Sequence, residues 1–299
     1  MRTYSIKELE NLSGTKAHTI RIWEQRYELL HPSRTETGIR FYNGDDLKKI
    51  LATSVLLKHG MKISKIATLT ASELNTQLEE IEKKNVLSDS AIELAINNLL
   101  MAGLKFDENA LNAEFTKLES AFDRYQLFTL ITHPLLNRLG LMWRKDDLSP
   151  LQEHFISNII RQKIISSINA LPDNEENSKE IVLFLPEHET HEIGLLLANY
   201  IFKSFQIKTI YFGQQVPMSN LIEYINEFKI KHAFGFIFYS YGIKELTNIF
   251  KNLSDNCGET YFYWAGYFPD QEIFDSIPNQ SIVSSIDSIK DLVNSIKND

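Results

Sequence analysis

The chain has 299 residues, of which 43% are hydrophobic and 11% aromatic, so it can bury a substantial core and is not expected to be disordered. Its net charge of −8 excludes a protein that binds nucleic acid over its whole surface, and its single cysteine, Cys257, excludes an intramolecular disulfide. Since domains usually hold about 100–200 residues, this length predicts two or three of them.

The charge is distributed unevenly along the chain. Residues 1–70 carry 12 basic and 7 acidic side chains, a net charge of +5, so the remaining residues carry −13. A basic module joined to an acidic one suits a protein that touches DNA with one end only. No stretch approaches the roughly 20 apolar residues that span a bilayer. The segment Met1–Tyr4 lacks a secretory apolar region. We therefore expect a cytoplasmic protein with no membrane partner.

Differences in charge and in hydrophobic pattern along the sequence predict three domains. Residues 1–75 are basic and hold short helical patterns, residues 85–172 show long helical periodicity, and residues 179–299 alternate apolar runs with amphipathic stretches. The polar segment Pro172–Ser178 is typical of a linker. We expect a multi-domain α and α/β protein.

The first domain begins with two short helices. Ser5 and Glu8 form a capping box that starts a helix running to about Leu12. The segment Ser13–Thr15 then predicts a tight turn around a glycine, followed by a second helix over 16–27. Two short helices joined in this way form a helix-turn-helix.

A wing follows the second helix. A turn around Glu36–Gly38 between two short extended arms places basic side chains beside the DNA backbone, while the second helix presents polar groups to a major groove. The predicted DNA contacts of helix, turn and wing are Thr15, Lys16, His18, Thr19, Arg21, Arg26, Arg34, Arg40 and Tyr42.

These residues resemble a known family. The segments Thr19–Glu24, Pro32–Arg34 and Gly38–Tyr42 are similar to the DNA-binding domain of the MerR family, in the same order. The resemblance implies a winged helix-turn-helix that binds double-stranded promoter DNA as a dimer on a near-palindromic site. A winged helix used for protein contacts is the alternative.

The middle domain is predicted to be an antiparallel four-helix bundle, because its periodicity is helical from Ala91 to Leu171. Trp143 is followed ten residues later by Glu153 and His154, near the start of a helix that Ser149 caps. On spacing alone, a core tryptophan and two solvated polar residues are the favoured explanation of this group.

The last domain is predicted to be a flavodoxin-like (Rossmann-like) parallel sheet, because short apolar runs alternate with helices. The predicted strands are Ile181–Leu185, Thr209–Phe212, Ala233–Tyr239, Tyr261–Trp264 and, less certainly, Ser281–Ile286. The predicted helices lie near 192–205, 218–229, 243–253, 269–276 and 287–297. Ligands of such sheets bind beyond the carboxyl ends of the strands.

The loop after the first strand is rich in ionisable groups. It holds Glu189, His191 and Gly194 in the pattern Glu-x-His-x-x-Gly. Imidazole is a good transition-metal ligand, and a neighbouring carboxylate can fix its tautomer. Gly194 removes a side chain where something flat must approach. A zinc site is not expected, because no cysteine cluster accompanies this loop.

The order of features resembles cobalamin-binding modules, most closely the light-sensing MerR-type regulators of the CarH and LitR group. The resemblance implies that His191 binds the cobalt of adenosylcobalamin from below, and that Trp143, Glu153 and His154 pack over its upper face. It also likens the segment Gly213–Pro217 to a family loop. The cofactor-binding residues implied are Trp143, Glu153, His154, Glu189, His191, Gly194, Ser240 and Gly266.

The sequence departs from that group at three places. Arg144 stands after the tryptophan, where some members carry a histidine near by that takes the upper cobalt position after illumination. Tyr241 follows Ser240 and can crowd the buried nucleotide tail. Ala265 replaces the first glycine of a common Gly-Gly pair, and a bulky Tyr267 follows it.

The prediction is a transcription regulator, a repressor or an activator, that senses light through adenosylcobalamin by changing its oligomeric state between dimer, tetramer or other forms. The resemblance implies control of carotenoid or light-response genes. The alternative is a cofactor-free regulator whose degenerate cobalamin domain mediates oligomerisation. A corrinoid carrier for methyl transfer has no use for the basic wing. Nothing resembles a nucleophile–base pair, so no enzyme is expected.

Overall fold

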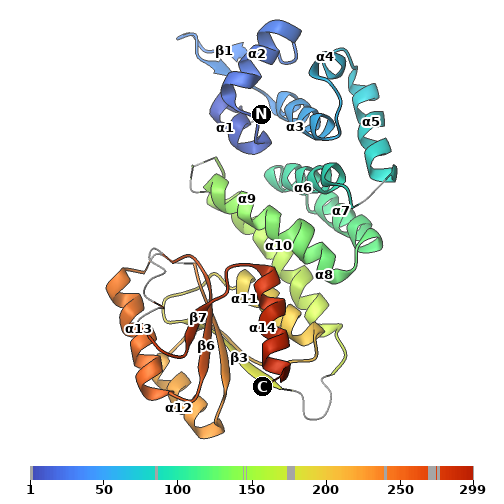
Figure 1. The fold of residues 1–299 in the computed structure, drawn as a ribbon. Coiled ribbons are helices and arrows are strands. Elements are labelled where there is room, and N and C mark those ends of the chain that lie inside the picture. Colours follow the sequence, from blue (N-terminus) through green and yellow to red (C-terminus); the bar gives the residue numbers. More distant parts are fainter. Residues whose placement is uncertain are drawn as a thin grey trace. The chain divides into compact units, whose positions relative to one another are not determined.

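The computed structural model describes residues 3–84, 87–143, 145, 147–173, 179–238, 241–268, 274 and 277–298. It divides into two compact units, Met1–Asn158 and Ile159–Asp299, and each is described by itself. The boundary between them falls inside the 20-residue helix α10, Pro150–Asn169 (Figure 1).

The first unit opens with a winged helix-turn-helix, called here the head. Its elements are α1 (Ile6–Ser13), α2 (Ala17–Tyr27), β1 (Ser33–Arg34), β2 (Arg40–Phe41), α3 (Gly44–Lys58) and α4 (Ile63–Ile66). The predicted capping box at Ser5 is present, and Gly14 ends α1 at φ 69°, a left-handed conformation that suits glycine. The strands β1 and β2 pair antiparallel as the predicted wing.

Glu10, and not the turn itself, caps the second helix. The Ala17 N–H donates to Glu10 Oε2 at 3.1 Å, whereas Lys16, the N-cap residue, makes no side-chain cap. The N–H of Ala17 and then the ammonium of Lys16 hold the pKa of the Glu10 carboxyl below its usual value. A carboxylate from α1 therefore fixes the start of α2.

Helix α5 (Ala71–Lys84) packs against its own unit. It contributes Leu74 and Ile81 to a buried cluster with Val55 and Leu56 of α3 and Leu94 of α6, which spans Asp89–Leu104. The apolar stripe of α5 is therefore covered within one chain.

The bundle follows, as predicted. It consists of α6, α7 (Glu108–Ala121), a continuous run of α8 (Arg124–Gln126), a π-helix η1 (Leu127–Thr132) and α9 (His133–Trp143), and then α10. The π-helical turn directly precedes Pro134, which has no N–H to donate to the preceding turn. Gly103 lets α6 approach Ile156 of α10, since an added methyl group would overlap that side chain. In the described ranges we find no helix with the length and apolar character needed to cross a membrane.

The second unit contains the predicted parallel sheet. Its strands are β3 (Glu180–Pro186), β4 (Lys208–Val216), β5 (His232–Ile237), β6 (Tyr261–Gly266) and β7 (Gln280–Ile282), in the order β4-β3-β5-β6-β7. The helices are α11 (Ile193–Ser204), α12 (Met218–Phe228), α13 (Ile243–Asn256) and α14 (Ile286–Asn298). Helices α12 and α13 lie on one face of the sheet and α11 and α14 on the other (Figure 1). This is the flavodoxin-like order, with its switch point between β3 and β5.

Two strand ends differ from the prediction. Strand β4 continues to Val216 through the segment predicted as a loop, with register shifts against β3 and left-handed residues at Gly213 (φ 76°) and Gln215 (φ 53°). Bulges of this kind allow a strand to continue past a glycine. Strand β5 ends at Ile237, two residues early. Most of the helix predicted near 269–276 lies outside the described residues.

The core under α12 and α13 is built around Trp264 of β6. Its fully buried ring meets Phe184 at 5.4 Å and Phe250 at 4.7 Å between centroids. The ring also covers Gly235 of the neighbouring strand, where an added methyl group would overlap it. The sheet therefore accepts this tryptophan only because Gly235 has no side chain.

The variant Gly235→Ala should lower the free energy of unfolding by about 1–3 kcal/mol, the usual cost of overpacking a core. Gly258→Ala is the matched control, because nothing lies within 4 Å of its added methyl group. Urea unfolding followed by circular dichroism measures both variants. Equal stability of the two would contradict this account of the core.

Candidate DNA-binding and ligand-binding sites

One face of α2 is exposed and carries the predicted DNA contacts. His18, Arg21 and Arg26 lie on it, together with Ile22 and Gln25, which the sequence analysis did not single out. Their spacing of three and four residues is that of a single helix face, while the fully buried Ile20 anchors the opposite face. An apolar residue and an amide among the basic ones are groups that contact thymine methyls and adenine edges in a major groove.

The predicted DNA contacts that flank this face are partly buried or already paired within the head. Lys16 is 82% exposed and pairs with Glu10 at 3.2 Å, while Thr15 and Thr19 are half-buried. In the wing, Arg34 is exposed and its Nη1 donates to the Gly38 carbonyl at 3.2 Å. Ile39 at the wing is 65% exposed. The wing thus presents one basic and one apolar side chain.

Glu24 ties the wing to α2. Its Oε1 accepts from Arg40 Nε at 2.9 Å and its Oε2 accepts from the Tyr42 hydroxyl at 3.0 Å. Tyr42 is fully buried, and burial followed by the bond to Glu24 raises the pKa of its hydroxyl well above the usual range. Tyr42, predicted as a DNA contact, is therefore enclosed in the head, and Arg40 is shared with Glu24.

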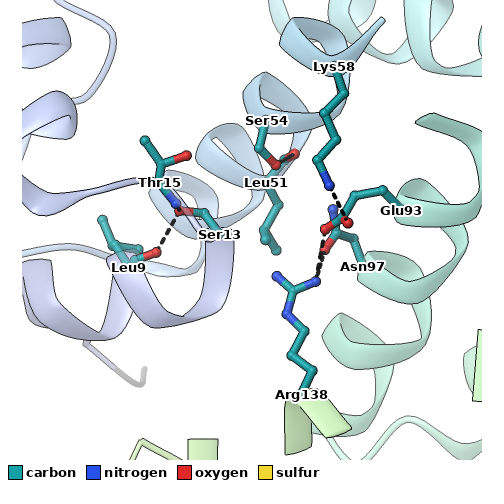
Figure 2. A network of polar contacts seen from close by, with 9 residues as sticks. All are labelled: Leu9, Ser13, Thr15, Leu51, Ser54, Lys58, Glu93, Asn97 and Arg138. Atoms are coloured by element: carbon teal, nitrogen blue, oxygen red, sulfur yellow. Dashed lines mark hydrogen bonds and ion pairs between the residues drawn. The ribbon is translucent and has the colours of Figure 1, made fainter. Parts of the chain in front are cut away.

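An ionic chain joins the head to the bundle (Figure 2). Lys58 at the end of α3 binds Glu93 of α6 at 2.7 Å, and Glu93 binds Arg138 of α9 at 3.0 Å. Arg138 also donates to the Asn97 side chain at 2.9 Å. Burial lowers the pKa of Arg138, and the neighbouring Glu93 opposes that effect. The head is therefore held against α6 by charges as well as by the α5 cluster.

A second contact reaches α1 from the loop after Trp143. Asn11 donates to the buried carboxylate of Asp147, and Lys145 Nζ donates to Asn11 Oδ1 at 2.8 Å. Burial raises the pKa of Asp147, while the bond from Asn11 lowers it. Asn11 thus links the first helix of the head to the segment between α9 and α10.

The predicted upper-face residues lie in the first unit. Trp143 ends α9 and is 49% exposed. On α10, His154 Nδ1 pairs with Glu153 Oε2 at 2.7 Å, and Ser157 donates to the other oxygen of Glu153. The structure thus brings Glu153 and His154 together, while Arg144 lies outside the described residues.

The Glu-x-His pair forms the most organised polar group of the second unit. Glu189 has no exposed side-chain surface, and its Oε1 accepts from the N–H groups of Thr190 and His191, both at 2.8 Å. The same oxygen accepts from His191 Nδ1 at 2.6 Å, and Oε2 accepts from the Phe238 N–H at 2.7 Å. The imidazole is 49% exposed and packs against the Phe238 ring at 4.9 Å. Its orientation is therefore fixed by a buried carboxylate.

Glu192, the next acidic residue, anchors the loop after β3 through hydrogen bonds to its own carboxylate. It accepts from the Tyr211 hydroxyl at 2.9 Å, from Arg161 Nε of α10 at 2.9 Å and from Gln214 Nε2 at 3.1 Å. Burial, and then the charge of Glu192, raises the pKa of Tyr211 far above its usual value. These bonds fix the backbone on which His191 stands.

The predicted glycines have partners within the chain. The ring of Phe236 covers Gly194, so that an added methyl group would overlap it. Gly266, at φ 124°, lies so close to the Ile237 carbonyl that no side chain fits. Tyr241 is buried and its hydroxyl donates to the Glu187 carbonyl. Ser240 lies outside the described residues.

This donor set fits a metal whose other ligands arrive with it. Among the described residues no group of three or more His, Cys, Asp or Glu side chains can hold a metal ion. A protein-only zinc cage needs at least three ligands. One oriented imidazole backed by a carboxylate suits a metal already held by a macrocycle.

Comparisons with known proteins agree with this architecture. Residues 4–73 match the model of the "MerR HTH family regulatory protein" family. The HTH-type transcriptional repressor CarH of Myxococcus xanthus is 28% identical over 222 residues, covering 74% of this chain and 74% of that protein. The repressor CarA of the same organism is 22% identical, covering 73% and 71%. These findings confirm the predicted resemblance to MerR-type regulators of the CarH group.

A solved structure confirms the fold of the C-terminal part. The monomethylamine corrinoid protein of Methanosarcina barkeri superposes with a TM-score of 0.59 and 12% identity, covering 68% of this chain and 99% of that one. The parallel sheet and helices of the second unit thus have the fold seen in that corrinoid protein.

The variant Glu24→Gln should weaken DNA binding about tenfold, because a wing released from α2 must be ordered on the DNA, at a cost of about 1.4 kcal/mol. An operator selected from random duplexes with the wild-type protein serves as the probe, followed by fluorescence anisotropy at fixed salt. Glu36→Gln removes the same charge from the exposed wing turn. Equal affinities of the two variants would show that Glu24 does not position the wing.

Proposed function

We propose that this chain, a transcriptional regulator of the MerR and CarH type with a corrinoid-protein fold in its C-terminal part, binds promoter DNA and a corrinoid. In this proposal residues 1–75 bind DNA, residues 85–172 form the bundle, and residues 179–299 bind the corrinoid through His191. The buried Glu189–His191 pair is the observation that carries it.

The Nε2 atom of His191 is the ring nitrogen that would ligate a metal in this proposal. Because Nδ1 faces the buried Glu189 carboxylate, Nε2 is the nitrogen through which the ring can ligate. The ring is half-exposed, and it stands beyond the carboxyl end of β3, beside the switch point of the sheet. A carboxylate in this position also raises the basicity of the imidazole as a ligand.

The proposed corrinoid is adenosylated, as in adenosylcobalamin. When bound, this group supplies a carbon–cobalt bond that light breaks. His191 would hold the group through its imidazole, and the buried carboxylate of Glu189 would orient that ring. We propose that loss of the adenosyl group shifts the oligomeric state, and that DNA affinity falls when linked heads separate. The roles of Trp143, Glu153 and His154 stay predictions.

A cofactor-free regulator is the second candidate, and specific contacts favour it. Gly194 and Gly266 are both explained by neighbours within the chain, without a ligand. In that case the α/β domain would serve only to assemble copies of the protein, and DNA binding would not respond to a corrinoid.

Adenosylcobalamin added in darkness should give wild-type protein a visible spectrum that changes on illumination, together with a fall in affinity for the selected operator. His191→Ala should abolish the bound spectrum while keeping the dark, cofactor-free DNA affinity. Spectroscopy after gel filtration and operator anisotropy measure the two effects. DNA binding that is the same for both proteins, with and without corrinoid or light, would favour the cofactor-free candidate.

Glu189→Gln should lower corrinoid affinity roughly 10–100-fold, the usual cost of removing a partner that orients a metal-bound histidine. An amide can accept through one oxygen only, whereas Glu189 accepts through both. Glu180→Gln, an exposed carboxylate paired with Lys208, is the control. Titration monitored by absorbance gives the affinities, and equal values would remove Glu189 from the site.

A further inference from the structure

We infer that Phe236 makes this domain select corrinoids that lack the nucleotide tail, an inference that rests on the proposed function. The observation behind it is that the recess left open by Gly194, one turn of α11 beyond His191, is filled by the Phe236 ring.

The tail matters because of how cobalamin is built. Its lower base is attached to the corrin ring through a phosphodiester-linked nucleotide loop on the lower face. A histidine that ligates cobalt from below displaces that base, but the loop stays attached on the same face. The displaced tail must then find room in the protein beside the histidine.

On the α11 side of β5, the described residues fill this space with aromatic side chains. Phe234 and Phe236 alternate along β5, so their side chains share one face, and Phe238 follows just beyond the end of the strand. Phe234 is fully buried against Phe202, at 5.5 Å between centroids. Phe236 covers Gly194, and Phe238 packs against the His191 ring. This aromatic row fills the layer from the core to the rim of the sheet.

On the opposite side of the sheet there is a cleft, but its lining does not suit the anionic phosphodiester of the tail. A cleft of about 390 Å³ lies between the loop after β3 and α13, and its lining includes the carboxylates of Glu187 and Glu245, the ammonium group of Lys244 and the imidazole of His188. The ring of Tyr241 also lines it and is held in place by its bond to the Glu187 carbonyl. A phosphodiester is anionic, so this lining disfavours it. Among the residues that the structure describes, the tail therefore meets the Phe236 ring on one side of β5 and a cleft that disfavours an anion on the other, so cobalamin binding requires Phe236 to move.

The test compares diaquacobinamide, which has no nucleotide, with aquacobalamin, and counts only binding that His191→Ala abolishes. Wild-type protein should bind cobinamide at least about tenfold more tightly than cobalamin, equivalent to about 1.4 kcal/mol. In Phe236→Ala the ratio should fall towards one, because cobalamin binding improves. Phe228→Ala, which removes an exposed ring from α12, should keep the wild-type ratio.

Absorbance titration gives the affinities, and circular dichroism checks folding. Phe236→Leu, which keeps most of the apolar volume, replaces the alanine variant if the latter does not fold. Equal binding of both corrinoids to wild-type protein, unchanged by the substitution, overturns the inference and leaves the proposed function standing. Binding of neither corrinoid through His191 overturns both.

Discussion

The C-terminal site depends on one buried carboxylate. Taking a carboxylate out of water is costly unless hydrogen bonds replace its hydration, and Glu189 meets this condition with N–H donors from its own loop, from Phe238 just after β5 and from the His191 ring. The bond from Phe238 ends the strand pairing of β5, which explains why β5 is shorter than its apolar run. The Glu189 side chain therefore fixes the conformation of its loop, the end of β5 and the orientation of the His191 ring.

The same arrangement recurs in the first unit. Glu10 caps α2, Glu24 binds the wing, and Glu93 joins α3 to α9. Each carboxylate stands on one element and accepts from side chains or N–H groups of another, so each fixes the relative position of elements that apolar packing alone would leave less defined. These acidic residues of the basic head thus connect its elements, while Arg21, Arg26 and Arg34 remain exposed.

Much of this architecture follows from local pattern. The capping box at Ser5, the glycine turn and the alternation of apolar runs with helices each depend on near neighbours, and the fold agrees with them. Contacts between distant segments do not follow in this way. Glu24 meets residues 16 and 18 positions away, and Phe236 covers a glycine from a different strand–helix unit.

Helix α5 has a consequence for how two copies meet DNA. The apolar residues of α5 are covered by α3 and α6 of the same chain, so they are not exposed as an apolar dimer interface for a second copy. Two heads are then not locked to each other at a fixed distance by this helix. Contacts elsewhere in the assembly would then set the separation and relative direction of the two DNA half-sites that the heads occupy.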